Sequence, residues 1–352
     1  MKKALLALAS FAACGGVLAQ SSVTIFGLVD ARLAVGKGSV SDRTQIATSG
    51  NGANRLGFRG VEDLGGGLNA GFWLEMGLAP DSGLGQPTNI NNQASGTGNA
   101  PAGTQGLTFN RRSTVSLSGS LGELRVGRDV TPILWSQSVF DPFSYLSVGI
   151  TQIATNIGGP TGVRASNSIG YFTPANLGGF YGQFMHFRGE NPSGTATSKD
   201  GNGSGVRAGY AAGPVDLALA WQRTDFAAGN IESANLGGTY DFGAFKATML
   251  LHRDEVVGVR TGKGWMLGAR VPVGPGEFKA SLSSYKGTLA SADRQTDKIA
   301  VGYVYNLSKR TAVYAHYARL NNKNGATEAL NGGITGANQH SSGFDLGLRH
   351  SF

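Results

Sequence analysis

The chain has 352 residues, of which 56 are Gly and 11 are Pro, and its formal net charge is +8. The glycines follow no three-residue period, which excludes a collagen-like chain, and a 40% share of hydrophobic residues excludes an intrinsically disordered one. The positive charges are dispersed without a basic patch or motif, so no nucleic-acid partner is predicted.

Residues 1–19 have the pattern of a secretory signal peptide. Two lysines precede an apolar run, residues 4–13, and small residues follow up to Ala19, after which we expect cleavage. The run is shorter than the roughly 20 residues that a membrane-spanning helix needs. Cleavage would remove Cys14, the only cysteine, although lipid attachment at Cys14 remains an alternative. Residues 20–352 are then expected to form one domain.

Segments of about ten residues in which apolar and polar residues alternate recur along this domain. From Val23 to Val35 the odd positions are apolar or small, whereas the even positions include Thr24, Asp30 and Arg32. Similar stretches are residues 68–76, 215–222, 245–252 and 298–305. One face of such a strand suits lipid and the other suits water, but a soluble β-sandwich would show the same alternation.

The spacing of the turns separates these two readings. Short turns rich in Gly, Pro and Asn are expected at residues 61–67, 120–123, 173–179, 211–215, 241–244, 272–277 and 306–309. Longer polar stretches lie between them, notably residues 78–107, 130–164, 188–205 and 321–342. Seven short turns and eight longer connections join sixteen strands, a pattern typical of an outer-membrane barrel. Sixteen strands leave a water-filled lumen.

The last segment is an alternating strand that ends in an aromatic residue. Phe344, Leu346, Leu348 and Phe352 lie on one face of it. A closed membrane barrel has to pair its last strand with its first, because lipid cannot satisfy an open strand edge. We therefore predict an all-β fold, a transmembrane antiparallel barrel.

Several long segments resemble the general Gram-negative outer-membrane porins, and in particular the beta-proteobacterial branch of anion-preferring trimeric porins. The segments are residues 22–30, 54–68, 69–75, 111–117, 122–129, 306–311 and 348–352. They occur in the same order as in the family and cover essentially the whole mature chain. The resemblance names no particular solute.

The resemblance implies a homotrimer of barrels in the bacterial outer membrane, with both termini periplasmic. It also implies that the family's third long loop, here residues 130–163, is folded into each lumen. The implied partners are outer-membrane lipid and lipopolysaccharide, small anions and hydrophilic solutes, and the barrel insertion machinery, which would read Phe352 as an assembly signal. Residues 78–107 form a long loop that could reach over a neighbouring barrel. No cofactor is implied.

Arginines are the candidate residues of the pore constriction, because a guanidinium stays charged at physiological pH. Alternation points Arg55 and Arg59 into the lumen, and Arg112 likewise. Strict alternation would point Arg128 at lipid, which is costly, but a bulge at Gly127 could turn it inward, and the resemblance favours that turn.

The resemblance places the lumen arginines of the family at Arg55, Arg128 and Arg164. Ordinary solvated surface charge is the alternative for these residues, and it is a stronger alternative for Arg111 and Arg112.

The third long loop contains few acids that could cancel this positive charge. Between residues 130 and 163 the only acidic residue is Asp141, which we expect to face the arginines across the lumen. An excess of positive charge in a narrow passage attracts anions and repels cations. We therefore predict passive diffusion of ions and small hydrophilic solutes with a preference for anions.

Enzyme functions receive little support from the sequence. The five histidines are scattered and have no metal-ligand spacing, and no nucleophile elbow or phosphate-binding loop is present. Residues 200–203 faintly resemble a calcium loop but lack its closing Glu. We predict no enzyme activity and no metal; the alternatives are an outer-membrane barrel hydrolase or a substrate-specific barrel channel.

Overall fold

The computed structural model describes residues 22–93, 106–289 and 292–352, so the expected signal peptide at residues 1–19 lies outside the described residues. The strands are β1 (Ser22–Lys37), β2 (Arg43–Thr48), β3 (Arg55–Gly65), β4 (Leu68–Ala79), β5 (Leu84–Gly85), β6 (Arg112–Gly119), β7 (Gly122–Val130), β8 (Arg164–Phe172), β9 (Phe180–Phe187), β10 (Gly203–Ala212), β11 (Val215–Thr224), β12 (Ile231–Asp241), β13 (Lys246–Val256), β14 (Arg260–Val273), β15 (Gly276–Leu289), β16 (Ala292–Asn306), β17 (Thr311–Lys323) and β18 (His340–Ser351). Two short helices, α2 (Pro132–Phe140) and η1 (Gln152–Thr155), lie between β7 and β8.

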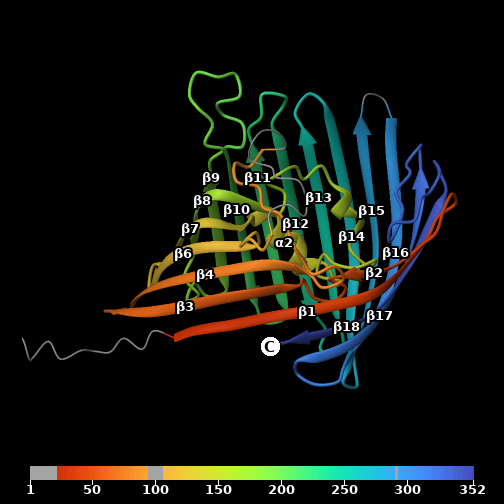
Figure 1. The fold of residues 1–352 in the computed structure, drawn as a ribbon, viewed down its shortest axis with the longest axis horizontal. Helices are drawn as coiled ribbons and strands as arrows, with labels where there is room; N and C mark the ends of the chain where they lie inside the picture. The colour runs from red at the N-terminus through yellow and green to blue at the C-terminus, as the bar shows by residue number, and fades with distance from the viewer. Residues whose placement is uncertain (1–21, 94–105, 290–291) are drawn as a thin grey trace, which may run out of the picture.

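The strands form one closed antiparallel barrel (Figure 1). β1 pairs with β18 along one edge and with β2 and β3 along the other, which closes the sheet. β2 and β3 occupy a single position in the wall, because each pairs with a different half of β1. The two residues of β5 pair only with the end of β4. The wall therefore has the sixteen positions that the turn spacing predicted.

The connections at the two ends of the barrel differ in length (Figure 1). All seven predicted short turns join strands at the end where the C-terminus lies. The opposite end carries the long loops, but the connections at 225–230 and 257–259 are short there as well, which the sequence did not predict. Long loops mark the extracellular end of an outer-membrane barrel and short turns mark its periplasmic end.

The outer wall is an apolar band bordered by aromatic residues. Leu219, Leu251, Leu267 and Leu282 point outward and remain exposed on the isolated barrel. Aromatic pairs lie at the periplasmic border of this band: Phe180 with Tyr210, Tyr240 with Phe242, and Phe278 with Tyr303. Such bands face lipid, and such aromatic girdles sit at the membrane interface. Within the described ranges, no helix has the length and apolar character that a membrane crossing demands.

Phe352 completes the closure of the barrel against Gly27 on β1. The Gly27 N–H donates to the Phe352 carbonyl at 3.0 Å, and the Phe352 N–H donates to the Gly27 carbonyl at 3.1 Å. A Cβ atom at position 27 would lie 2.2 Å from Cζ of Phe352. Only glycine at position 27 leaves room for the Phe352 ring where β1 meets the C-terminal end of the chain.

The third long loop, residues 131–163, folds into the lumen along the inner wall. Helix α2 contacts β9 to β13, and η1 contacts β14 to β16. Phe140, Ile153, Leu250 and Met266 form a buried apolar cluster between this loop and the wall. The loop therefore occupies one side of the lumen and leaves the inner faces of β3, β4, β6 and β8 opposite to it.

Candidate pore constriction

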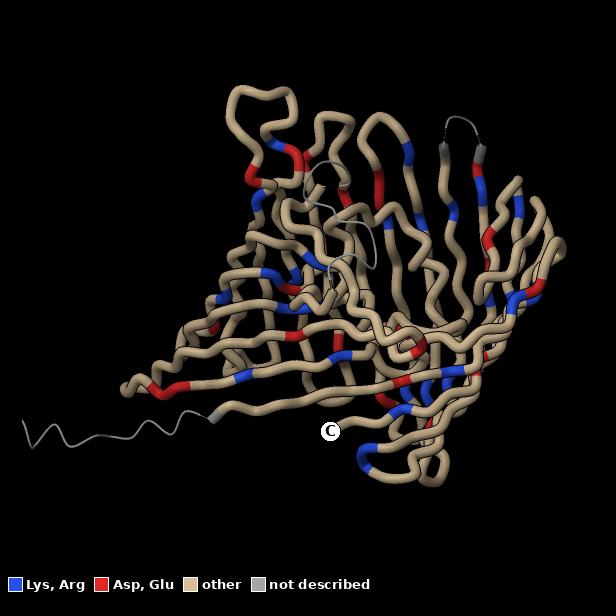
Figure 2. Tube along the Cα trace, in the orientation of Figure 1, with Lys and Arg blue, Asp and Glu red and all other residues tan. Residues whose placement is uncertain are grey.

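The inward faces of the N-terminal strands meet in an arginine-rich cavity of about 450 Å³, hereafter the arginine cavity. Five arginines line it: Arg55 and Arg59 from β3, Arg112 from β6, Arg111 just before β6, and Arg164 at the start of β8. Trp135 of α2 contributes the side of the inserted loop. Both signs of charge lie along these strands (Figure 2).

Two carboxylates enter the arginine cavity and each pairs with one of its arginines. Glu75 Oε1 lies 2.5 Å from Nε of Arg111. Asp129 Oδ2 lies 3.7 Å from Nε of Arg112 and also 3.2 Å from Nη1 of Arg125. Five arginines against two carboxylates leave the cavity lining with an excess of positive charge.

Aromatic rings hold two of the arginine heads in place. Arg59 lies 5.2 Å from the ring centre of Trp73, and Arg112 lies 4.6 Å from it. The Trp73 ring packs edge-on against Phe26 at 4.9 Å, and its Nε1 donates to Oε2 of Glu75 at 3.0 Å. Guanidinium groups stack on aromatic faces without losing their charge, so this arrangement fixes position and keeps the positive field.

Arg55 and Arg164 have no carboxylate partner. Nε of Arg164 donates to the Arg111 carbonyl at 2.8 Å. The Arg55 guanidinium forms no hydrogen bond or ion pair with the described residues, although it lies near enough to Glu75, Arg111 and Arg349 to interact with their charges. The charges of these two side chains are therefore not neutralised by an ion pair with a carboxylate of the described residues.

The structure does not bring Arg128 into the arginine cavity, which corrects the sequence-based expectation. The bulge exists: the β7–β8 register shifts between Gly127 and Asp129. However, Nε of Arg128 donates to the Asn110 carbonyl at 2.6 Å and its Nη1 to Oγ of Ser166 at 2.8 Å. The shift leaves Arg128 on the alternation of its strand, in a separate pocket that the outward-facing Val126 and Ile169 also line.

The structure also corrects the expectation for Asp141. Its side chain is fully buried, and its carboxylate accepts the N–H groups of Phe143 and Thr151, both at 2.9 Å. Burial raises the pKa of Asp141, against the effect of these N–H groups and of the cationic Lys298 and Arg270. Asp141 therefore organises the inserted loop and subtracts no charge from the arginine cavity.

Polar side chains of the wall hold the inserted loop in a fixed path. Four contacts reach its backbone: Asn235 Nδ2 to the Ile133 carbonyl at 3.1 Å, Gln222 Nε2 to the Thr161 carbonyl at 2.9 Å, Gln152 N–H to Ser283 Oγ at 2.9 Å, and Val148 N–H to Asp345 Oδ2 at 2.8 Å. These wall residues belong to β11, β12, β15 and β18, so the loop is tied to much of the barrel circumference. The loop is therefore held in a fixed position against the inner wall of the barrel.

The partners of the arginines were not predicted from the sequence. Glu75 and Trp73 lie on β4, and Asp129 follows the misassigned Arg128 on β7. Glu75 lies on the polar face of the alternating segment at residues 68–76. Because the polar face of each strand is expected to face the lumen, the sequence could have placed Glu75 inward. The ring contacts of Trp73 depend on how β3, β4 and β6 sit side by side, for which the sequence contains no local signal.

A second group of inward cations was also missed. Arg270 Nη2 donates to the Asp141 carbonyl at 2.7 Å, and Lys279 Nζ donates to Asn51 Oδ1 at 3.0 Å. Lys298 is nearly buried behind the inserted loop. Lys298 begins the alternating stretch of residues 298–305, so its inward direction was predictable, whereas its position behind the loop was not.

Comparison with known proteins places this barrel in a family. A model of Gram-negative porins matches residues 4–325. Outer membrane porin protein 32 of Delftia acidovorans is 40% identical over the full length of both chains, and an outer membrane porin protein of Bordetella pertussis is 27% identical over 90% of this chain and 93% of its own. The solved anion-selective porin from Comamonas acidovorans is 35% identical, covers 95% of this chain and 100% of its own, and has a TM-score of 0.82. The chain therefore belongs to the Gram-negative porin family of the outer membrane, as the sequence resemblance predicted.

Proposed function

We propose that this porin is a passive, water-filled channel that prefers anions and that its preference arises in the arginine cavity. The observation that carries the proposal is the imbalance of charge there: five arginines face two carboxylates, and Arg55 and Arg164 have no carboxylate partner. In a narrow passage with low-dielectric walls, such an excess raises the local concentration of anions and repels cations.

Arginine suits this task better than lysine does. Its head is weakly hydrated and planar, so an anion can exchange part of its water shell for N–H donors without being held tightly. The aromatic stack on Trp73 keeps Arg59 and Arg112 in position while the ion passes. The solved relative from Comamonas acidovorans is described as anion-selective, which agrees with this proposal.

The proposal includes assembly as a homotrimer, which the sequence resemblance implies. The described start of the long loop at residues 78–107 is attached to its own barrel: Asn92 Nδ2 donates to the carbonyls of Ser166 and Arg188, both at 2.9 Å. Residues 94–105 of that loop, expected to reach a neighbour, lie outside the described residues. Trimers would show as a slow band in electrophoresis of unheated protein.

The zero-current potential of the purified porin in a planar bilayer tests the proposal. Under a tenfold KCl gradient, the potential should have the sign of the chloride equilibrium potential, with about 59 mV as the limit for ideal selectivity. A potential of the opposite sign would refute the anion preference, and absence of stepwise conductance would refute the pore.

A further inference from the structure

Helix α2 of the inserted loop buries polar side chains and leaves its largest aromatic side chain in the lumen. Ser136 and Gln137 are buried, and Nε2 of Gln137 lies 3.0 Å from Nδ1 of His252 on β13. Trp135 is only half-buried and lines the arginine cavity. A helix usually turns its apolar residues to the core and its polar residues to water, so these positions show the reverse order. The anion preference proposed above rests on charge and leaves Trp135 without a role.

Backbone hydrogen bonds connect the start of α2 to the strand that carries Arg164. The Trp135 N–H donates to the Thr131 carbonyl at 3.1 Å, and the Thr131 N–H donates to the Val163 carbonyl at 3.2 Å. Arg164 follows Val163 and begins β8. Trp135 and Arg164 therefore reach the arginine cavity from neighbouring backbone positions.

The Trp135 ring is in contact with another aromatic ring at one side only. Its ring centre lies 6.3 Å from that of Phe172 on β8, and the two rings meet edge to face at 61°. The face of Phe172 is covered by Arg125 at 3.7 Å, as the face of Trp73 is covered by two arginines. Among the described residues, no guanidinium lies over the Trp135 ring in this way. A solute in the arginine cavity can therefore contact that ring.

The arginine cavity thus combines free guanidinium charge with an accessible aromatic surface. Arg55 and Arg164, which have no carboxylate partner, can donate N–H groups to the carboxylate of a solute. Trp135 can receive an aromatic ring edge to face or offset, the arrangements that aromatic pairs prefer.

Two further properties of the cavity favour an aromatic ring over a saturated one. A guanidinium is attracted to the face of an aromatic ring by the ring quadrupole, which a saturated ring lacks, so the arginines also attract the ring itself. The volume of about 450 Å³ is sufficient, since a cavity of about 150 Å³ holds benzene in a protein interior.

We propose that the arginine cavity selects organic anions that carry an aromatic ring, with simple aromatic carboxylates as the solute class. The carboxylate lies at Arg55 and Arg164, and the ring lies against Trp135. Inorganic anions pass through the same cavity and use its charge alone. This inference rests on the proposed anion channel and adds to it a solute class, with Trp135 as the residue that determines the specificity.

Block of the KCl current by organic anions in a planar bilayer tests this inference. Benzoate, cyclohexanecarboxylate and acetate all carry one negative charge at neutral pH, but only benzoate has an aromatic ring. Benzoate should halve the current of the unmodified porin at a concentration about threefold below that of cyclohexanecarboxylate, and acetate should require the highest concentration. Equal half-blocking concentrations of benzoate and cyclohexanecarboxylate would overturn the proposal, because charge and apolar area alone would then explain the binding.

Two substitutions of Trp135 test the residue. Trp135→Leu should raise the half-blocking concentration of benzoate to that of cyclohexanecarboxylate. Trp135→Phe keeps an aromatic ring and should retain a preference for benzoate. Both variants leave every arginine of the cavity in place. A benzoate preference that persists in Trp135→Leu, or that is lost equally in Trp135→Phe, would overturn the assignment of the solute ring to Trp135.

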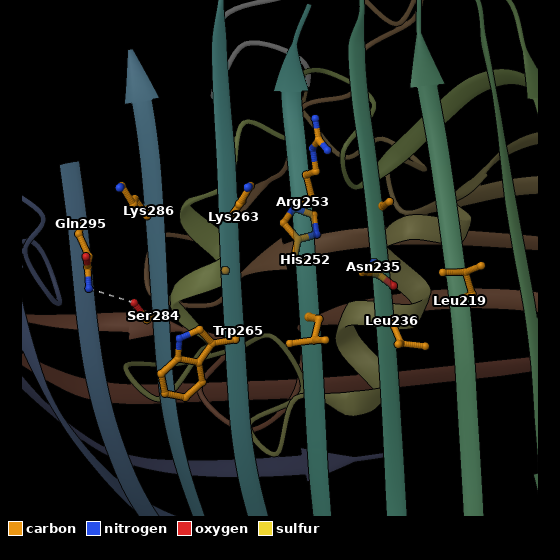
Figure 3. Close-up of a pocket in the computed structure, with 13 residues that line it drawn as sticks. Leu219, Asn235, Leu236, His252, Arg253, Lys263, Trp265, Ser284, Lys286 and Gln295 are labelled. Carbon is orange, nitrogen blue, oxygen red and sulfur yellow. Dashed lines mark hydrogen bonds between the residues drawn. The ribbon is translucent and has the colours of Figure 1, made fainter. Parts of the chain in front are cut away.

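The matched control is Trp265→Leu. Trp265 lies on β14 and lines a groove of about 590 Å³ on the outer wall of the barrel, away from the lumen (Figure 3). This variant should have the same three half-blocking concentrations as the unmodified porin, and an equal loss of benzoate preference would overturn the lumenal location of the site. Failure of the anion channel itself would be seen separately, as a zero-current potential of cation sign for the unmodified porin in KCl without an organic anion.

Discussion

The effect of a lumenal arginine on ions depends on which residues surround its guanidinium. Arg111 and Arg112 are each paired with one carboxylate, whereas Arg55 and Arg164 are not. Their contributions to the field along the path therefore differ even though all four line the same cavity. Arg128 is held by a backbone carbonyl and a serine in a different pocket.

The contrast between Arg111 and Arg128 gives a test at the residue scale. Arg111→Ser removes one positive charge and leaves Glu75 unpaired in the arginine cavity. The zero-current potential of this variant should move toward the potassium equilibrium potential. Arg128→Ser, the matched control, should leave it unchanged. An equal shift for both variants would mean that Arg128 lies on the ion path, as the sequence alone suggested.

Alternation predicted the inward direction of Arg55, Arg59 and Arg112, because side-chain direction in a strand is a local property. It could not be applied where the strand has not yet begun, because Arg111 precedes the first residue of β6. For Arg128 the outward direction given by alternation was right, and the inward turn expected at the bulge near Gly127 was wrong.

At the scale of elements, the inserted loop depends on close contact with the inner wall. A Cβ atom at Gly237 on β12 would lie 2.1 Å from Cδ2 of Phe140, the last residue of α2. The ring of Phe140 is fully buried and therefore has no free space in which to move. The length of this loop and its lack of acids were predictable from sequence. Its path was not, because the contacts join residues about a hundred positions apart.

Gly237→Ala should therefore displace Phe140 and destabilise the inserted loop. Overpacking of this kind typically costs about 1–3 kcal/mol. Thermal unfolding should show the loss, and the single-channel current should become noisier or change in size. Gly170→Ala is the matched control, since its nearest heavy atom would lie 3.6 Å from the new Cβ. Equal melting temperatures and currents for the two variants would show that the contact with Phe140 does not hold the loop.

At the scale of the whole molecule, the barrel is closed by a pairing between the two ends of the chain. β18 pairs with β1 from Leu28↔Ser351 to Lys37↔Ser342, and Phe352 adds its ring over Gly27. The number of strands and their closure were predictable, because turn spacing and the terminal alternating strand are sequence features. The packing of the Phe352 ring against Gly27 was not predictable, because it depends on the register in which β18 pairs with β1.

Deleting Phe352 should lower the yield of folded barrel in cells. We propose that the residue acts both in closure and as the signal read by the insertion machinery, and Gly27→Val separates the two roles. This variant keeps the terminal Phe but fills the space that its ring occupies, because a Cβ at position 27 would lie 2.2 Å from the ring. Low yield of the deletion in cells together with its normal refolding in detergent would support the signal, and low yield of Gly27→Val would support the role in closure. Normal yield of the deletion in cells would contradict both roles.

The zero-current potential of Arg55→Ser/Arg164→Ser tests the central claim most directly. Unit charges a few Å apart interact by several kcal/mol at an effective dielectric near 20, and salt in the pore screens part of this. If about 1 kcal/mol per ion remains, the chloride-to-potassium permeability ratio should fall several-fold in low salt and less in high salt. Fold and heat-modifiable migration should be unchanged. A potential in low salt equal to that of the unmodified porin would contradict the account, because the arginine cavity would then not determine which ions pass.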